Sequence, residues 1–232
     1  MKLAIMQPYF FPYIGYFQLI ATVDMFIVYD NIKYTKKGWI NRNRMLRNGR
    51  DSMFSLPLKS ASDSLDVCNR ELAADFNRDK LIDQFVGAYG RAPYFRQTLP
   101  LVERVVRYEE ANLFRFLYHS INRTCEHLGI TTKIGNSSGI AIDHGLRSQD
   151  KVLALCEAVG ASTYVNAIGG MELYSKETFQ RKGIELTFLK SKPFEYPQFG
   201  LPFVACLSIV DLMMFNPLDT IQTCIATNYE LT

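Results

Sequence analysis

The sequence predicts an α/β protein: a Rossmann-like three-layer domain with a mostly parallel sheet, a β-hairpin and a helical insertion. Three observations predict it. Within residues 3–29 an apolar run, a loop, a helix-length apolar segment and a second apolar run follow one another, which is the order of a βαβ unit. An Asn48-Gly49 pair between two strand-like segments indicates a hairpin turn. Helical periodicity over residues 65–128 gives way to alternating strand-like and helix-like segments.

Length and composition fit one domain with an insertion. The chain has 232 residues, 48% hydrophobic and 21% charged, as is usual for a globular protein. We expect a core domain formed by residues 1–64 and 129–232, with residues 65–128 as a helical insertion or subdomain. No apolar run reaches the roughly 18 residues that span a bilayer, and the N-terminus lacks a signal-peptide pattern. A cytoplasmic protein without a membrane span is therefore expected.

The first loop, residues 7–13, is expected to be stiff and is rich in aromatic residues. Two prolines fix the backbone, and tyrosines and phenylalanines crowd between them. We expect Phe10 and Phe11 to pack on the core. Gln7, Tyr9 and Tyr13 carry polar groups and are candidate substrate-binding residues, because ligands bind beyond the carboxyl ends of parallel strands.

Residues 31–50 hold the strongest charge signal. Seven cations and no acids occur there, although the whole chain has a net charge of only +3. Such a segment is either a solvated basic hairpin or a binding site for a diphosphate or a nucleic-acid backbone. Under the second interpretation the candidate ligand-binding residues are Lys33, Trp39, Asn41, Arg42 and Arg44.

Two later loops are candidate parts of the same site. A polar loop between residues 133 and 139 contains Asn136, Ser137 and Ser138, whose side chains could hold a phosphate or sugar. After a short strand at residues 162–166, Asn166 is followed by Gly169 and Gly170, which allow either a tight turn or close approach to a ligand.

Three residues are candidates for proton transfer. His144 lies outside the periodic segments and beside Asp143, and Asp30 closes the second strand. Asp150 lies in the first turn of a helix expected over residues 151–159, where a structural role at the helix N-terminus is the alternative. Ser148 is the expected N-cap of that helix. Arg147 is a further candidate for substrate binding.

The C-terminal third continues the α/β alternation. A helix is expected around residues 174–182, a strand over 184–189, and an apolar helix over 207–214 that contains Asp211. Asp211 is expected to make a structural hydrogen bond. The residues after Met214 are expected to form a polar tail. Five cysteines without paired spacing indicate reduced thiols, and we expect neither a metal nor a cofactor.

The sequence also resembles a known family. The opening MQPYFFPYIGYFQLI, the later YDNIKYTKKGWINRNRM, the pair Ser137-Ser138, the stretch TYVNAIGG and the Ser-Ile-Val-Asp of residues 208–211 are similar to segments of WbqC-like bacterial proteins. The resemblance implies a role in making O-antigen and other surface polysaccharides, including lipopolysaccharide. It also implies modification of amino sugars in the precursors, such as attachment of glycine.

Three functions follow as hypotheses. The first is an N-acyltransferase that acts on a nucleotide-linked amino sugar, with aminoacyl-tRNA as donor and tRNA bound by residues 31–50. The second is a non-catalytic protein that binds a nucleotide-sugar or another anion. The third is a nucleotidyl- or phosphotransferase, which would need a magnesium site built from carboxylates such as Asp24 and Asp30. The sequence sets neither the sugar nor the oligomeric state.

Overall fold

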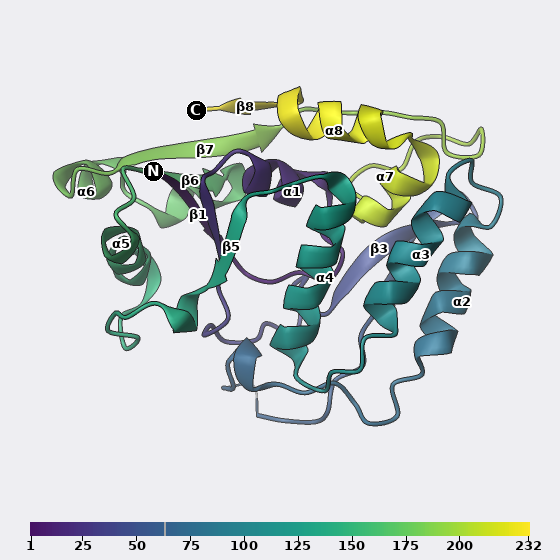
Figure 1. Cartoon of the computed structure of the whole chain (residues 1–232), viewed down its shortest axis with the longest axis horizontal. Coiled ribbons are helices and arrows are strands. Elements are labelled where there is room, and N and C mark those ends of the chain that lie inside the picture. Colours follow the sequence, from purple (N-terminus) through teal and green to yellow (C-terminus); the bar gives the residue numbers. More distant parts are fainter. Residues whose placement is uncertain (63) are drawn as a thin grey trace.

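The computed structural model describes residues 1–62 and 64–232 and is built on a six-stranded sheet with helices on both faces (Figure 1). The strand order is β5-β2-β1-β6-β7-β8, and every neighbouring pair is parallel except β7 and β8. With the hairpin strands set aside, this is the 3-2-1-4-5-6 order of doubly wound nucleotide-binding sheets. The predicted α/β fold is confirmed. The strands are β1 (Lys2–Met6), β2 (Met25–Val28), β5 (Lys133–Asn136), β6 (Thr163–Ala167), β7 (Glu185–Ser191) and β8 (Tyr229–Leu231).

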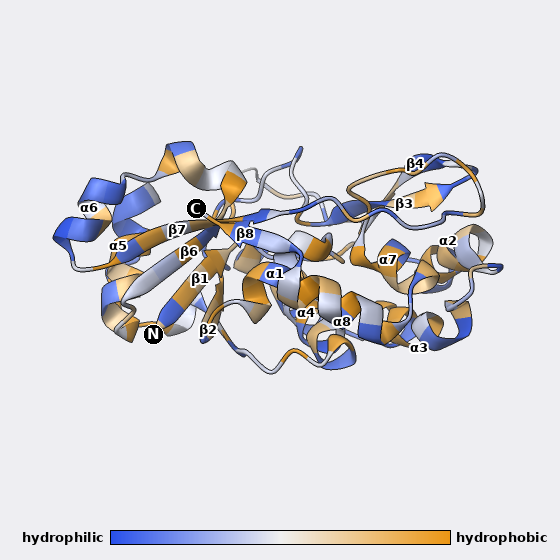
Figure 2. Ribbon diagram, turned by 90° about the horizontal axis from the view of Figure 1, so that it is seen from above, coloured by the Kyte–Doolittle hydropathy of each residue, from blue (hydrophilic) through white to orange (hydrophobic). Residues whose placement is uncertain are grey.

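The alternation of side chains along β1 divides the core into two layers. Leu3 and Ile5 belong to one buried cluster, together with side chains of α5 (Ser148–Val159) and α6 (Lys176–Arg181). Ala4 belongs to a larger cluster on the opposite face, with α1 (Ile14–Ala21) and α8 (Leu218–Thr227). This separation follows from the two-residue period of a strand. Figure 2 shows α5 and α6 at one side of the sheet strands and α1, α8 and α4 at the other.

The predicted hairpin forms a separate two-stranded sheet. Strands β3 (Arg42–Arg47) and β4 (Arg50–Ser55) pair antiparallel, and the turn has positive φ at both Asn48 (52°) and Gly49 (71°). Positive φ at both positions is the requirement of a type I′ turn, which an Asn-Gly pair meets with little strain. The hairpin thus lies outside the main sheet, as Figure 2 shows.

The helical segment has three main helices and a short turn of 3-10 helix. They are η1 (Val67–Asn69), α2 (Arg78–Tyr89), α3 (Phe95–Val106) and α4 (Leu113–Leu128). Asn77 and Asn112 cap α2 and α4 through their side chains, and Gly129 ends α4 with φ of 72°. These helices share the larger core cluster with α1 and the hairpin. The division into a core domain and a 65–128 subdomain stays a prediction.

The C-terminus differs from the prediction. Helix α7 (Ile209–Phe215) lies where an apolar helix was expected, but the expected polar tail is wrong, because α8 and β8 follow. In α8 the side chains of Ile221, Cys224 and Ile225 are buried at a spacing of three and four residues. Asp211 in α7 is fully buried and accepts hydrogen bonds from Tyr89, Tyr196 and Gln198 at 2.7–2.8 Å.

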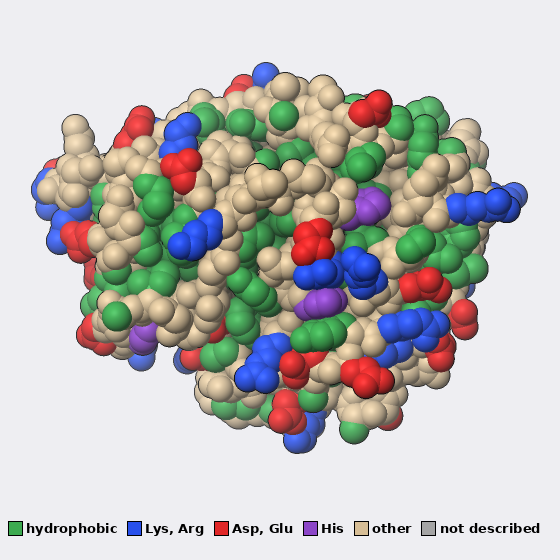
Figure 3. Space-filling model, in the orientation of Figure 1, with side chains coloured by type: hydrophobic (Ala, Val, Ile, Leu, Met, Phe, Trp, Pro, Cys, Tyr) green, Lys and Arg blue, Asp and Glu red, His purple; other side chains and the backbone are tan. Residues whose placement is uncertain are grey.

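The surface has no large region of one charge on the face seen in Figure 3. Lysine, arginine and carboxylate side chains are interspersed there, and charged side chains and histidine gather near the middle of the view. This pattern fits the small net charge of +3. Among the described residues, no helix combines the length and the apolar character needed to cross a bilayer.

Candidate functional site

A cavity of about 1110 Å³ lies beyond the carboxyl ends of β1, β2 and β6. The strand order reverses between β1 and β6, and in sheets of this kind the crevice at such a reversal is where ligands bind. Five chain segments supply its walls. They are the β1–α1 loop with the start of α1, the segment after β2, Asp66 before η1, the first turns of α5 with the loop before them, and the segment after β6. The polar and charged lining residues are Gln7, Tyr9, Tyr13, Tyr16, Tyr29, Asn31, Lys33, Asp66, His144, Arg147, Ser148, Gln149, Lys151, Asn166, Glu172 and Tyr174.

The β1–α1 loop is held in place by its buried aromatic residues. Phe10 and Phe11 are fully buried, as predicted, and Asn43 of the hairpin donates to both of their backbone oxygens at 3.1 and 2.8 Å. The hydroxyl of Tyr16 donates to the backbone oxygen of Gln7 at 3.0 Å. The rigid loop therefore keeps the side chains of Gln7 and its tyrosine neighbours at the cavity wall.

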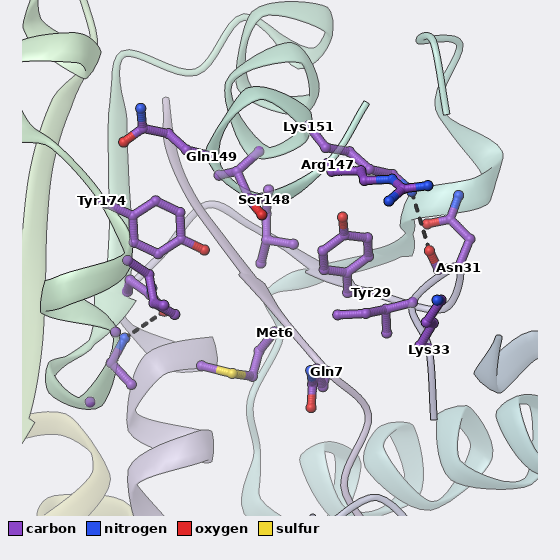
Figure 4. Close-up of a pocket in the computed structure, with 18 of the residues that line it drawn as sticks. Met6, Gln7, Tyr29, Asn31, Lys33, Arg147, Ser148, Gln149, Lys151 and Tyr174 are labelled. Atoms are coloured by element: carbon purple, nitrogen blue, oxygen red, sulfur yellow. Dashed lines mark hydrogen bonds between the residues drawn. The ribbon is translucent and has the colours of Figure 1, made fainter. Parts of the chain in front are cut away.

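A buried lysine lies in the cavity wall. Lys151, from the first turn of α5, is only 5% exposed, and its Nζ donates to the backbone oxygen of Asn31 at 3.2 Å. The ammonium also lies 5.1 Å from the ring centroid of Tyr29. Burial lowers the pKa of Lys151, and the nearby Asp66 and Asp30 oppose that shift. In Figure 4, Lys151 and Arg147 reach together toward Asn31, with Tyr174 on the other side of the cavity.

The N-terminus of α5 opens into the same cavity. Its N-cap is Arg147, whose side chain makes no capping hydrogen bond, so the expected N-cap role of Ser148 is wrong. Ser148 is instead the first helical residue, at a φ of 48° that is uncommon for a residue other than glycine. Uncapped N–H groups and the positive end of the helix dipole together favour an anion.

Two tyrosines supply hydroxyl donors to the cavity. Burial raises the pKa of Tyr29 to about 12 and also raises the pKa of Tyr174. Both hydroxyls are therefore protonated at neutral pH and able to donate hydrogen bonds to a ligand.

Asp30 lies behind the cavity wall. It is 2% exposed and accepts hydrogen bonds from the Ser137 hydroxyl at 2.7 Å, from the backbone and hydroxyl of Ser138, and from Asn136. Burial raises the pKa of the carboxyl, but these hydrogen bonds outweigh it and bring the pKa below its ordinary value. The ionised carboxylate thus joins the end of β2 to η2 (Ser137–Gly139) after β5.

His144 contacts this hydrogen-bond network through Asn31. The side-chain amide of Asn31 lies 2.9 Å from Nδ1 of His144 and 2.8 Å from the hydroxyl of Ser137. The histidine itself is exposed and lines the cavity. An imidazole in this place can take or give a proton to a bound ligand.

Asn166 and Gly170 occupy adjacent space at the end of β6. A Cβ atom on Gly170 would lie 2.4 Å from Nδ2 of Asn166, so the absence of a side chain on Gly170 makes room for the amide. Gly169 has open space around its Cα, which leaves the neighbouring wall accessible to a ligand. Glycine at position 170 thus makes room for a protein side chain, whereas glycine at position 169 leaves room for a ligand.

The sequence model of the WbqC-like protein family matches residues 7–223 of the chain. The chain belongs to the WbqC-like family. It is also 28% identical over 229 residues to the uncharacterized protein Rv1507c of Mycobacterium tuberculosis, with 93% of each chain covered. No solved structure matches the chain.

In this WbqC-like protein, half of the predicted site residues come together. Nine of them line the cavity although they come from separate segments of the chain. They are Gln7, Tyr9, Tyr13, Lys33, His144, Arg147, Asn166, Gly169 and Gly170.

The others lie outside the cavity lining. Asp30 and Ser137 are buried behind it and form hydrogen bonds with the half-buried Asn136 and the exposed Ser138, which favours a supporting role for these residues. Asp150 is exposed in the first turn of α5, where its charge stabilises the helix N-terminus.

The predicted hairpin residues are occupied by contacts of their own. Arg42 donates to the backbone oxygen of Gly38, and Arg44 donates to that of Cys206 while its guanidinium lies 5.5 Å from the Trp39 ring centroid. Asn41 accepts from a tyrosine and donates to a backbone oxygen. None of these side chains lines the cavity. Their contacts instead stabilise the hairpin and the segment that leads into it.

Sequence reasoning missed Lys151, Tyr29, Asn31 and Tyr174. A lysine in an amphipathic helix is usually on the solvated face, so the pattern around Lys151 does not indicate its burial. The position of Asn31, directly after Asp30 at the end of a strand, is the sequence feature that could have identified it as a cavity residue. Within residues 1–62 and 64–232, no group of three or more His, Cys, Asp or Glu side chains is placed to hold a metal ion.

Proposed function

We propose that this WbqC-like protein is an N-acyltransferase that modifies the amino group of a nucleotide-linked amino sugar during O-antigen or related surface-polysaccharide synthesis. The proposed donor is an aminoacyl-tRNA, for example one that carries glycine. One observation carries the proposal: a cavity at the sheet reversal where Lys33, Arg147 and Lys151 meet the uncapped N-terminus of α5.

That arrangement suits a diphosphate. Three cations and the first turn of a helix offer charge and N–H donors to phosphate oxygens. The ammonium of Lys151 is buried, and in the described part of the chain its hydrogen bond goes to a backbone oxygen and not to a carboxylate. A buried ammonium with a lowered pKa gains most from an anionic ligand, because that ligand offsets its desolvation.

The rest of the cavity suits a sugar. Tyrosine hydroxyls and the amides of Gln7 and Asn166 provide donors and acceptors for hydroxyl groups, while the tyrosine rings provide apolar surface. The volume of about 1110 Å³ lies slightly above the about 300–1,000 Å³ common for small-molecule sites. There is thus room for a nucleotide-sugar and for the acyl group that must reach it.

The reaction is an aminolysis of an ester. The sugar amine attacks the carbonyl carbon of the aminoacyl ester, a C–N bond forms, and the C–O bond to the tRNA ribose breaks. His144 takes the proton that the amine loses and returns one to the leaving ribose oxygen. Gln7 or Asn166 stabilises the negative charge that develops on the carbonyl oxygen. The amide product needs no covalent enzyme intermediate.

The hairpin offers a separate surface for the donor. Lys37, Arg47 and Arg50 are exposed and lie outside the cavity lining. Exposed cations bind the phosphate backbone of a nucleic acid with strong salt dependence, since binding releases condensed counterions.

The decisive experiment combines the purified protein with radiolabelled glycyl-tRNA and a UDP-linked amino sugar, and follows transfer of label to the sugar. Label in an amide-linked, base-stable product is the expected result. His144→Gln should lower the rate about 100-fold or more while nucleotide-sugar binding by calorimetry is retained. Nucleotide-sugar binding without transfer from any of the twenty aminoacyl-tRNAs would refute the proposal and leave a binding protein.

A further inference from the structure

We infer that Asn31 is a positioning residue that holds His144 in its Nδ1–H tautomer and leaves the Nε2 lone pair free to accept a proton. The inference deepens the proposed acyl transfer and rests on it for the use of that lone pair. The tautomer itself follows from counting protons around one buried hydroxyl.

The Ser137 hydroxyl has three polar neighbours. The backbone N–H of Asp30 donates to Ser137 Oγ at 3.2 Å, the Asp30 carboxylate lies at 2.7 Å, and the Asn31 side-chain amide lies at 2.8 Å. A hydroxyl has one proton and two lone pairs. It can therefore donate to only one of the two side chains, and the other must donate to it.

Charge decides which side chain receives the proton. The hydrogen bonds that Asp30 accepts hold the pKa of its carboxyl below the ordinary value. The carboxylate is therefore ionised at neutral pH and can accept hydrogen bonds but not donate them. Hydrogen bonds to an ionised acceptor are roughly twice as strong as those to a neutral one. Ser137 therefore donates to Asp30, and the NH₂ end of Asn31 donates to Ser137.

This orientation sets the proton on His144. The structure draws Nδ2 of Asn31 at 2.9 Å from Nδ1 of His144 and Oδ1 at 2.8 Å from Ser137 Oγ. The two ends of an amide are assigned from the hydrogen bonds around them, and the proton count at Ser137 reverses this assignment. The amide nitrogen then faces Ser137, and the amide oxygen faces Nδ1 of His144. An amide oxygen only accepts, so Nδ1 must carry the hydrogen, and Nε2 of the neutral ring is unprotonated. The opposite amide orientation would place two acceptors against each other at Ser137 and would turn Nε2 into a donor.

The backbone of Asn31 is held as well. Lys151 donates to its carbonyl oxygen at 3.2 Å, so the residue is fixed at both ends between the helix and η2. The charged groups that face this corner of the cavity are Lys33, Asp66, Arg147 and Lys151. Within the described chain, Asn31 is the one residue whose side chain forms a hydrogen bond with the imidazole of His144.

The tautomer can be measured directly by long-range proton–nitrogen correlation spectra of protein labelled with ¹⁵N-histidine. The chain has only three histidines, and the spectrum of His144→Gln assigns the resonance of interest. At a pH where the ring is neutral, we expect Nδ1 of His144 to be protonated and Nε2 to be unprotonated. Protonation at Nε2 in the wild type would overturn the inference.

Two variants test whether Ser137 and Asn31 set the tautomer of His144, and a third is the control. Ser137→Ala removes the hydroxyl that orients the amide and should let the ring relax toward the Nε2–H form, as should Asn31→Ala. Ser138→Ala removes a neighbouring hydrogen bond to Asp30 without touching Asn31, and should retain the Nδ1–H form. A spectrum unchanged in Ser137→Ala, with the fold intact by circular dichroism, would also overturn the inference.

Activity separates this inference from the proposed function. Asn31→Ala should lower kcat for acyl transfer about tenfold or more with little change in KM, because the base is lost from the productive tautomer. A correct tautomer in a protein that transfers no acyl group would refute the acyltransferase and leave the positioning intact. An enzyme that transfers the acyl group while His144 is in the Nε2–H form would refute only the positioning role of Asn31.

Discussion

Replacing Lys151 by methionine should have opposite effects on ligand binding and on stability. The substitution removes the charge and keeps a flexible apolar chain of similar length. A hydrogen bond to a charged group contributes about 1.5–3 kcal/mol, which corresponds to about a 10- to 150-fold loss of affinity for a diphosphate-containing ligand. Calorimetric titration with UDP and with the UDP-linked amino sugar measures this loss.

The expected gain in stability follows from burial. The Lys151 side chain is 5% exposed, and the pKa of the ammonium is lowered from 10.5 in the folded protein. Its unfolded state therefore binds more protons than its folded state over the interval between the two pKa values. The destabilisation is fully present below the folded pKa and is relieved as pH rises toward 10.5. Lys151→Met should accordingly raise stability at neutral pH, and its advantage should shrink in alkaline solution.

Lys37→Met is the matched control, because that lysine is exposed and lies outside the cavity lining. It should leave both UDP affinity and stability within error of the wild type. Urea unfolding at neutral and alkaline pH measures the stability part. UDP affinity unchanged in Lys151→Met would refute the assignment of this ammonium to the anion subsite, and a loss of stability at neutral pH would refute the argument from burial.

Three further substitutions have clear expected outcomes. Asp30→Ala should cost about 2–4 kcal/mol at neutral pH. This cost should fade in urea unfolding as acid protonates the wild-type carboxyl, whose folded pKa is below 3.8. Asp211→Ala leaves three donors without their acceptor, two of them on buried side chains, and should cost a similar amount by the same measurement. A cost below about 1 kcal/mol would contradict the network. Gly170→Ala should displace the Asn166 side chain and weaken sugar binding in calorimetry while changing the melting temperature little.

Local pattern was sufficient for most elements of the fold. The Asn48-Gly49 turn, the Gly129 helix end and the alternation of apolar runs all depend on neighbours close in sequence, and the structure confirms them. The C-terminal elements were missed, because α8 has only a narrow buried stripe and β8 is three residues long.

The site was harder to predict because its contacts are long-range. Nothing near Arg44 in sequence indicates that its guanidinium donates to the backbone oxygen of Cys206, 162 residues away. The partners of Asp30 lie 106–108 residues away, so its burial could not be read from the strand that precedes it. Strand ends, by contrast, were informative: in a parallel sheet they converge on one edge, which is why Gln7 and Asn166 were found together.

The cations of this protein fall into two groups that suit different anions. Lys151 is buried beside the positive end of α5, where salt screens it little, whereas Arg47 and Arg50 are exposed on the hairpin. A compact diphosphate in the cavity should therefore bind with weak salt dependence. Binding of tRNA should weaken steeply with salt, and Lys37→Ala with Arg47→Ala and Arg50→Ala should reduce the log–log slope by about two to three.

A matched triple variant, with alanine at Arg96, Lys133 and Lys192, removes the same charge from exposed positions outside the hairpin and the cavity lining. If both triple variants lowered the tRNA slope equally, the hairpin would have no special part in tRNA binding, and net charge alone would account for it. If UDP binding also fell steeply with salt, the diphosphate would lie in solvent and not against the buried ammonium. Measuring the two salt dependences on the same protein thus tests, in one series, whether two anionic substrates use separate surfaces.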